Sequence, residues 1–455
     1  MESDTIVALS TPPGESGIAV VRLSGSEAIA ILEGMAPGMR EAAPRVIHKK
    51  TLRDGSGEPI DETLVFVSLS PASYTGEDMA EISCHGGMQV VSDLLEEIVR
   101  RGARLASPGE FTKRAFLNDR LDLAQAEAVA DLICAETKLQ RRVALEHLEG
   151  RLSQRVREME DALLEQLAAV EVSIDFSEED LPIFSPQEMR RVVRDFRMRL
   201  AKLLESEGAG GKLRHGLRVT ILGPRNVGKS SLYNALIGEE RAIVSPVPGT
   251  TRDLLRERIH VGGFSYFLED TAGIAETGCE IETRGILIGR QAAERADLVL
   301  FVVDGSAAIT AGIIDELDRM DRSKVLCVLN KQDLGLALSV EEAREKLRVG
   351  DVAAVSALRG EGLEGLRGWV FAKTVKRDAA EIARERIAVN ARQAEGLREA
   401  DQALERLDSL LAEGAPAEIL SIEIRAAADS LGKITGRAVT GSLLEMIFSR
   451  FCIGK

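Results

Sequence analysis

Residues Gly223–Ser231 (GPRNVGKSS) have the side chains and the spacing of a loop that binds a polyphosphate. They follow the apolar run Leu217–Leu222 and lead into residues of helical character, which predicts a strand, a tight glycine turn and the start of a helix. Backbone N–H groups in such a turn point at the phosphates, where the helix dipole adds favourable potential. Lys229 would reach the outer phosphates, and Ser230 would offer its hydroxyl to Mg²⁺. This loop alone only suggests nucleotide binding, because its pattern also arises by chance.

Three further motifs concern the metal and the base. Asp270–Gly273 (DTAG) ends a strand-like stretch, where a carboxylate can bind the metal through water and a glycine N–H can meet the terminal phosphate. Asn330–Asp333 (NKQD) follows the apolar run Val325–Leu329, and Asp333 would accept hydrogen bonds from guanine that adenine cannot donate. Gly249–Asp253 (GTTRD) supplies a threonine for the magnesium shell. The order and the spacing of these motifs predict a guanine-nucleotide domain.

Composition and charge restrict the class of protein. The 455 residues are enough for about three domains, and 45% of them are hydrophobic. No run of 18 apolar residues is present and Met1–Asp4 begins no signal peptide, so we expect a soluble, cytoplasmic protein without a membrane-bound part. The five cysteines form no CxxC pair, which argues against structural zinc and disulfides. The net charge of −15 means that any contact with RNA needs a local basic surface.

Helix and strand patterns divide the chain into parts. The first hundred or so residues alternate strand patterns, such as Gly17–Leu23 and Thr63–Leu69, with helix patterns, such as Met88–Arg101. From Pro108 to about Leu204 nearly everything has helical period. We therefore expect a compact N-terminal α/β or α+β domain that is followed by helices.

Two apolar stripes with helical spacing flank the nucleotide motifs. Between the first stripe and the nucleotide motifs lies Glu207–Gly216 (EGAGGKLRHG), whose glycines predict a flexible linker. Because neither stripe can be buried alone, we expect one discontinuous helical-bundle domain with the nucleotide domain inserted into it. The stripes comprise Leu145, Leu148, Leu152, Val156, Met159, Leu163, Leu167 and Val170, and then Ala394, Leu397, Ala400, Leu404, Leu407 and Leu411.

Five blocks of the sequence resemble the bacterial and organellar family of GTPases that modify the wobble uridine of tRNA, called MnmE or TrmE. The resemblance covers essentially the whole chain, and no other family of GTPases known to us combines its N-terminal and C-terminal blocks. The blocks are residues 4–25 (DTIVALSTPPGESGIAVVRLSG), 73–87 (SYTGEDMAEISCHGG), 108–133 (PGEFTKRAFLNDRLDLAQAEAVADLI), the GTTRD loop and 451–455 (FCIGK).

The resemblance implies a multidomain protein of α/β and all-α parts. Residues 1–118 would form a folate-binding and dimerisation domain, 119–215 and 375–455 the two parts of the helical domain, and 216–374 an inserted Ras-like P-loop G domain. It also implies a homodimer, a flavoprotein partner, MnmG, in a heterotetramer or larger complex, and tRNA. Together these would add an aminomethyl or carboxymethylaminomethyl group to C5 of the wobble uridine, with a carbon from 5-formyltetrahydrofolate or a related reduced folate.

The resemblance assigns residues to GTP and its metals. Ile274 stands where many small GTPases have the glutamine that orients the attacking water, and the family gives this role to Glu282, for which a solvated helix face is the alternative. A potassium ion bound by Asn226 would replace an arginine finger when two G domains meet. The potassium ligands would be Asn226, Ser245, Val247 and Thr250, and the magnesium ligands Ser230 and Thr251. The residues assigned to nucleotide binding are Asn226, Val227, Gly228, Lys229, Ser230, Ser231, Ser245, Pro246, Val247, Pro248, Gly249, Thr250, Thr251, Asp270, Thr271, Ala272, Gly273, Asn330, Lys331, Gln332, Asp333, Ser356, Ala357 and Leu358.

A folate pocket is implied by the resemblance alone. A pterin pairs with a carboxylate and a glutamate tail with cations, and the matching positions are Arg22, Glu81, Arg120 and Lys455. On sequence alone, Arg22 is more simply an outward charge on a strand. Cys452 is either a catalytic thiol beside this pocket, with a pKa lowered by the cationic terminus, or a buried structural cysteine among apolar neighbours.

Two questions stay open at this level. The chain is either the GTP-hydrolysing component of a tRNA-modifying complex or a regulatory or ribosome-assembly GTPase whose N-terminal domain only binds a partner. The surface that meets RNA is equally open, because a row of arginines is more often a solvated helix face than a path for phosphates. The candidates are Arg190, Arg191, Arg194 and Arg197, and separately Lys113 and Arg114.

Overall fold

The computed structural model divides into two compact units. The first comprises Met1–Ile133, His147–Arg197 and Gly396–Lys455, and the second comprises Cys134–Glu146 and Met198–Glu395. Each unit is therefore assembled from segments that are far apart in the sequence. The structure describes residues 4–175, 185–238, 256–270, 291–375, 380, 382, 384, 386–437, 439, 441–449 and 451–455.

The N-terminal part of the first unit is built on a six-stranded sheet with the order β3-β4-β5-β2-β1-β6. All neighbouring strands are antiparallel except β1 and β6, which are parallel. Val21, Val65 and Ile82 point to one face, where they form a core with helices α1 (Ala28–Met35) and α2 (Met88–Arg100). The strands are β1 (Ile6–Leu9), β2 (Ser16–Ser24), β3 (Ile47–Arg53), β4 (Pro59–Ser68), β5 (Met79–Gly86) and β6 (Arg104–Leu105).

The predicted combination of strands and helices in this part is confirmed, and its mostly antiparallel sheet agrees with the α+β alternative. The expected strands Gly17–Leu23 and Thr63–Leu69 correspond to β2 and β4, and the expected helix Met88–Arg101 is α2. Residues of the opposite parity, such as Arg22 and Glu81, lie on the sheet face away from α1 and α2, because side chains alternate along a strand. This second face carries the cavity described below.

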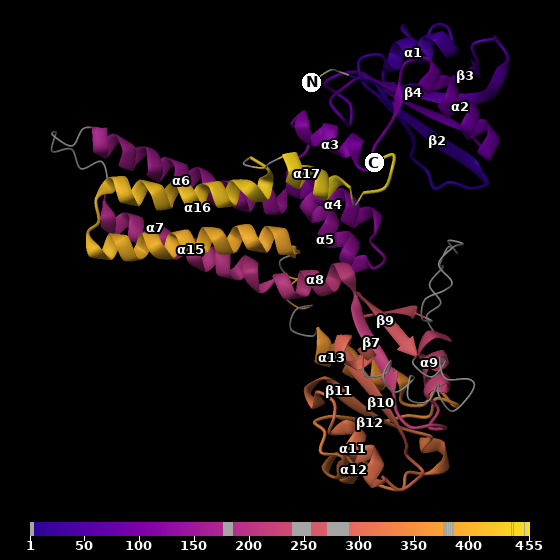
Figure 1. The fold of residues 1–455 in the computed structure, drawn as a ribbon, viewed down its shortest axis with the longest axis vertical. Coiled ribbons are helices and arrows are strands. Elements are labelled where there is room, and N and C mark those ends of the chain that lie inside the picture. The colour runs from indigo at the N-terminus through magenta and orange to yellow at the C-terminus, as the bar shows by residue number, and fades with distance from the viewer. Residues whose placement is uncertain are drawn as a thin grey trace. The chain divides into compact units, whose positions relative to one another are not determined.

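Long helices form the other part of the first unit, and Figure 1 shows α6, α7, α15 and α16 running alongside one another. All six residues of the second apolar stripe are buried on α15, as predicted. The prediction of one continuous buried stripe is wrong at the start of the first stripe, where the chain forms two helices. Helix α5 ends at Leu148, and α6 begins at Arg151, after Gly150 with φ of 86°. Leu145, on α5, is 38% exposed. The helices with most of their residues in this unit are α3 (Glu110–Leu117), α4 (Leu123–Ile133), α6 (Arg151–Asp175), α7 (Pro186–Glu205), α15 (Ala391–Glu413), α16 (Ala417–Thr435) and α17 (Gly441–Phe448), whereas α5 (Lys138–Leu148) belongs mostly to the second unit.

The predicted flexible linker is a helix. Residues Glu207–His215 form α8, which ends at Gly216 with φ of 68°. Gly210 is needed for packing, because a Cβ at this position would lie 2.4 Å from the carbonyl oxygen of Val389. Gly210 thus allows two backbone segments to approach each other closely. The prediction of flexibility was wrong because composition does not distinguish glycines that make a segment flexible from glycines that allow close packing.

The second unit contains a six-stranded sheet with the order β12-β11-β10-β7-β9-β8. Its strands are parallel except β8, which runs antiparallel to β9. In the sheet, β7 lies between β9 and β10. The order of the strands therefore changes direction at β7, and α/β proteins bind their ligands at such a point. The elements are β7 (Leu217–Leu222), α9 (Lys229–Gly238), β8 (Arg256–Val261), β9 (Phe264–Asp270), β10 (Leu298–Asp304), α11 (Ala311–Leu317), β11 (Val325–Asn330), α12 (Val340–Leu347), β12 (Val352–Ala354) and α13 (Leu363–Thr374).

The fold class expected from the sequence is confirmed, because the chain contains two sheets and many helices. In the part of the chain that the structure describes, none of the helices has the length and apolarity needed to cross a bilayer.

Candidate nucleotide site and N-terminal cavity

The loop between β7 and α9 has the geometry of a phosphate-binding turn. Gly223 has φ of 139°, and a Cβ there would lie 2.1 Å from the carbonyl oxygen of Val302 on β10, so only glycine fits. Asn226 has φ of 63°, a conformation that asparagine tolerates better than most residues. Lys229 begins α9 and its Nζ donates to the carbonyls of Gly223 and Pro224 at 2.9 and 2.7 Å. The Lys229 ammonium group is therefore hydrogen-bonded to the backbone of the phosphate-binding loop itself.

Asn330, at the end of β11, joins this loop to a second one. Its side chain is buried, Nδ2 donates to the carbonyl of Val227 at 2.9 Å, and Oδ1 accepts from the N–H of Ala357 at 3.0 Å. A Cβ on Gly228 would lie 2.3 Å from Asn330 Nδ2, so the glycine is what lets the asparagine reach the loop. One side chain thus fixes two of the predicted nucleotide-binding segments relative to a third.

Lys331 and Asp304 form a link that the motifs did not predict. Lys331, with φ of 66°, donates from Nζ to the carbonyl of Asn226 at 2.8 Å and to Asp304 Oδ2 at 2.7 Å. Burial alone would raise the pKa of Asp304, but hydrogen bonds from Lys331 and Ser306 hold it below its usual value. The only signal in the sequence is an aspartate at the end of an apolar strand, which is too common to assign a role.

Asp333 is held by Ser356. The buried Ser356 hydroxyl donates to Asp333 Oδ1 at 2.6 Å, and this hydrogen bond is the largest cause of a pKa below the usual value for Asp333. The carboxylate is therefore oriented and ionised, as recognition of a ring N–H and an amino group requires. Gln332 N donates to Val355 O at 3.1 Å, and the Leu358 side chain is 86% exposed.

The structure brings part of the predicted nucleotide set together. Asn226 to Ser231, Asn330 to Asp333 and Ser356 to Leu358 belong to loops at the carboxyl ends of β7, β11 and β12. Asp270 is the last residue of β9, next to β7 in the sheet. The other assigned positions lie outside the described residues and stay predictions: Ser245, Pro246, Val247, Pro248, Gly249, Thr250, Thr251, Thr271, Ala272, Gly273 and Glu282.

A second candidate site lies on the N-terminal sheet, on the face away from α1 and α2. Arg22 and Glu81 are directly opposed in the pairing of β2 and β5, and Arg22 Nε donates to Glu81 Oε1 at 2.8 Å. The Arg22 side chain is only 15% exposed, and its guanidinium lies 5.9 and 5.7 Å from the ring centres of Tyr74 and Phe111. Arg22 is therefore not simply an outward charge on a strand.

Glu81 and Arg120 line one cavity of about 330 Å³, together with Arg45, Phe66 and Tyr74. Arg120 Nε donates to the carbonyl of Ser73 at 3.1 Å. The cavity thus combines one carboxylate with two arginines and aromatic walls. This composition suits a flat ligand with a hydrogen-bonding ring and an anionic end.

The C-terminal residues pack against this face. The Gly454 carbonyl accepts from Arg22 Nη1 and from the Ser10 hydroxyl, each at 3.2 Å. Burial, and then the nearby charge of Arg22, lowers the pKa of Lys455. Cys452 is exposed, so the alternative of a buried structural cysteine is wrong, while its catalytic role stays a prediction. Three of the four predicted folate residues, Arg22, Glu81 and Lys455, are thereby neighbours.

Comparisons with known proteins identify the family. The model of the GTP-binding protein TrmE N-terminus matches residues 5–120, and the model of the MnmE helical domain matches residues 123–452. The chain belongs to the MnmE family of tRNA modification GTPases. It is a GTP hydrolase of that family, and its guanine-nucleotide domain implies GTP and Mg²⁺ in general terms.

Relatives match from end to end. The tRNA modification GTPase MnmE of Aquifex aeolicus is 42% identical over 99% of this chain and 100% of its own length. That of Thermoanaerobacter pseudethanolicus is 39% identical over 100% of both. Among solved structures, the G domain of the T. maritima FeoB iron transporter is 26% identical over 34% of this chain and 98% of its own, with a TM-score of 0.26, which is too low to carry an argument. The names of the MnmE relatives favour the tRNA-modification hypothesis over ribosome assembly.

The arginines considered for RNA are largely engaged within this MnmE-family chain. Arg190 Nε pairs with Asp408 at 3.0 Å, and Arg197 Nε with Asp401 at 2.8 Å, so both join α7 to α15. The Arg114 side chain is 11% exposed and pairs with Asp4, Glu77 and Glu110. Arg114 is therefore a poor candidate for phosphate contact, and the row on α7 is partly neutralised.

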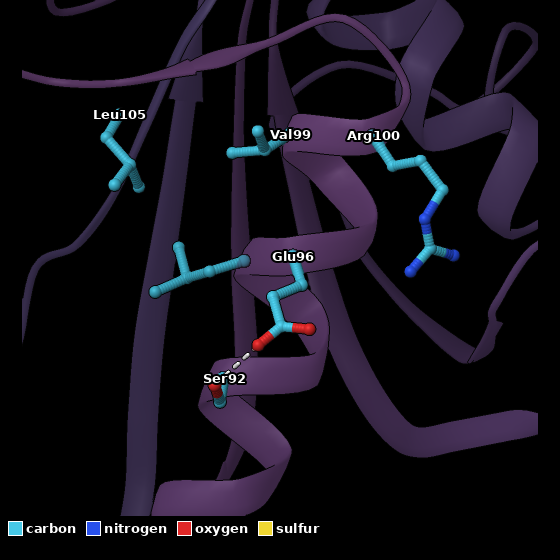
Figure 2. Close-up of a pocket in the computed structure, with 6 residues that line it drawn as sticks. Ser92, Glu96, Val99, Arg100 and Leu105 are labelled. Atoms are coloured by element: carbon cyan, nitrogen blue, oxygen red, sulfur yellow. Dashed lines mark hydrogen bonds between the residues drawn. The ribbon is translucent and has the colours of Figure 1, made fainter.

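A larger groove of about 550 Å³ lies beside α2 and β6, away from all the predicted site residues (Figure 2). Val99 and Leu105 are 39% and 61% exposed there, and Ser92 donates to Glu96 at 3.2 Å. Its one cation, Arg100, is already paired with Glu97 at 2.5 Å. Size alone does not make a site, and we place ligand binding in the smaller cavity, where several polar groups converge.

Proposed function

We propose that this chain is the GTP-hydrolysing component of the complex that adds an aminomethyl or carboxymethylaminomethyl group to C5 of the wobble uridine in tRNA. The observation that carries the proposal is the end-to-end match to tRNA modification GTPases. The two sites support it, because a guanine-nucleotide loop system and a cavity suited to a folate occur in one chain. The active form would be a homodimer in complex with the flavoprotein MnmG, in the cytoplasm, with the G domain of residues 216–374 inserted into helical parts 119–215 and 375–455.

In the nucleotide site, this chain's own residues bind and orient GTP. Asp333 would select guanine, the loop from Gly223 to Gly228 would hold the phosphates, and Lys229 would leave its two loop carbonyls to contact them. Ser230 would hold Mg²⁺ together with Thr251. Each metal would supply positive charge where negative charge develops in the transition state.

Asn226 fits the assignment of a potassium ligand. It is exposed on the phosphate loop, and its side-chain amide forms no hydrogen bond with the residues that the structure describes. Its amide oxygen is thus available to a hard monovalent cation. Ser245, Val247 and Thr250 would complete the site and Glu282 would orient the water, as the family resemblance implies.

The N-terminal cavity fits a reduced folate, residues 1–118 being the folate-binding and dimerisation domain. Glu81, which pairs with Arg22 and lies near Lys455, would accept hydrogen bonds from the pterin, and Arg120 would meet the anionic tail. The bound folate would supply the one-carbon unit, and Cys452 would act beside it.

The test is nucleoside mass spectrometry of tRNA from a strain that lacks the gene. We expect the C5 aminomethyl nucleosides to disappear and to return with the wild-type gene but not with Lys229→Ala. The control is Lys373→Ala, a lysine of the same domain that pairs with Asp351 at 2.9 Å, which should restore the nucleosides fully. Unchanged nucleosides in the deletion strain would rule out the proposed function.

A further inference from the structure

Two arginines from distant segments are fixed to the same short loop in the N-terminal cavity. Arg45 Nη2 donates to the carbonyl of Ala72 at 2.8 Å, and Arg120 Nε donates to the carbonyl of the next residue, Ser73, at 3.1 Å. Both side chains line the cavity that contains Glu81. The two guanidinium groups are thus each anchored to one of two consecutive residues and line the same cavity.

Arg45 is held there at a conformational cost. Its φ is 62°, in the left-handed region that costs a residue with a side chain roughly 1 kcal/mol. The Arg45 N–H donates to the carbonyl of Val67 at 2.8 Å, which keeps the backbone in this conformation just before β3 begins. Strained residues that the surrounding structure holds in place are found preferentially at ligand sites.

The charges around the cavity are unbalanced. Glu81 is the one carboxylate among its lining residues, and Glu81 already pairs with Arg22 at 2.6 Å. Among the residues that the structure describes, neither Arg45 nor Arg120 forms an ion pair, and both are exposed at the rim. Each guanidinium has five N–H donors in a planar fork, of which one is used, so each can still bind a carboxylate.

We propose that Arg45 is a specificity-determining residue, which together with Arg120 binds the two carboxylates of the glutamate end of the folate. The inference rests on the proposed folate function of the cavity. The ring of the ligand then lies toward Glu81 and Phe66, and its glutamate lies at the arginine rim. The chain therefore selects a folate that carries its glutamate over a pteroate that lacks it.

The test measures the Kd of the full-length protein for 5-formyltetrahydrofolate and for 5-formyltetrahydropteroate, which lacks both glutamate carboxylates and ends in the carboxylate of its benzoate ring. Loss of one charge-assisted hydrogen-bonded pair should weaken binding of the folate to Arg45→Ala by roughly 10-fold to 100-fold. The Kd for the pteroate should change by less than about threefold. Arg45→Lys, which keeps the charge but not the fork, should fall between.

Arg53→Ala is the matched control. Arg53 is the last residue of β3, the strand that follows Arg45, and it donates from Nη1 to the carbonyl of Gly57 at 2.8 Å, but it does not line the cavity. It should leave both Kd values unchanged, and thermal melting should show that all variants are folded. If the wild type binds neither compound, the folate function itself is wrong. If the wild type binds the folate but Arg45→Ala weakens both compounds equally, or neither, the role of Arg45 is overturned.

Discussion

At the scale of single residues, the guanine-nucleotide loops depend on one another through Asn330. Its amide bridges Val227 and Ala357, and the absence of a side chain at Gly228 makes this bridge possible. Asp333 lies three residues further on and is oriented by Ser356. The proposed recognition of the base therefore depends on a few hydrogen bonds whose removal has predictable consequences.

Replacing Asp333 by asparagine should lower the affinity for GTP and favour the xanthine nucleotide. The carboxylate accepts from the ring N–H and the amino group of guanine, while an amide cannot accept both and can donate to the second carbonyl of xanthine. We expect GTP binding to weaken roughly 10-fold to 100-fold, since a hydrogen bond to a charged group contributes about 1.5–3 kcal/mol. Competition between the two nucleotides measures this directly.

The control for this variant is Asp321→Asn. Asp321 also accepts from a serine hydroxyl, that of Ser323 at 2.6 Å, and its pKa is likewise lowered by that hydrogen bond. It lies outside the nucleotide loops, so its replacement should leave the preference for GTP intact. An unchanged preference in Asp333→Asn would contradict the assignment of the base-recognising residue.

Residues in local motifs could be predicted from the sequence, whereas residues whose partners come from other strands could not. Lys229, Asn330 and Asp333 occur at fixed spacings that the loop geometry itself requires. Asp304 and Arg45 acquire their partners only through strand order and loop packing, which no local spacing reports. The sequence therefore predicts residues that belong to one local motif, but it does not predict pairs of residues that only the fold brings together.

At the scale of elements, α8 shows that glycines can mark close packing. Gly210 and Gly211 are neighbours in this helix. A Cβ added to Gly210 would lie 2.4 Å from the carbonyl oxygen of Val389, whereas a Cβ added to Gly211 would have no atom within 4 Å. Gly211→Ala should stabilise the second unit by about 0.5–1 kcal/mol, because alanine favours a helix. Gly210→Ala should destabilise it by about 1–3 kcal/mol through overpacking.

Urea denaturation followed by the fluorescence of Trp369 measures both variants, because this single tryptophan lies on α13 in the same unit. Equal effects of the two substitutions would show that α8 does not pack as described. The comparison is internally controlled, since both changes add one methyl group to the same helix.

The attachment of α3 to the N-terminal sheet should depend on pH. Although burial would raise it, hydrogen bonds from Arg104, Ser107 N and Arg114 lower the pKa of Glu110 from 4.5 to about 2. Since this pKa is lowered on folding, the stabilisation is present above about pH 4.5 and is lost as the pH falls toward 2. It should contribute on the order of 1–3 kcal/mol at pH 7.

Glu110→Gln should therefore lower the free energy of unfolding at pH 7, and the difference from the wild type should shrink between pH 4.5 and pH 2. Urea denaturation followed by circular dichroism measures it. Glu418→Gln is the control, because Glu418 is also in the first turn of a helix in this unit but is exposed. A difference that stays constant with pH would contradict the ionised network around Glu110.

At the scale of the whole molecule, the periodicity of apolar residues predicted which helix faces are buried. Leu397, Leu404 and Leu407 are buried on α15 as their spacing indicates. Each unit of the structure is assembled from separate segments of the chain, while the division into helical parts and an inserted G domain stays a prediction. Periodicity could not predict where α5 ends and α6 begins, because the stripe continues across Gly150. It also gives no information about the second copy of the chain and the partner protein that the proposed function includes.

In the proposed function, a monovalent cation at Asn226 completes the GTPase when two G domains meet. The most direct measurement is the rate of GTP turnover in potassium and in sodium buffers of equal ionic strength, for the wild type and Asn226→Ala. We predict that the wild type is at least about 10-fold faster in potassium, as loss of one transition-state contact costs about 1.4 kcal/mol or more, and that Asn226→Ala is slow in both. Equal wild-type rates in the two salts would contradict the claim.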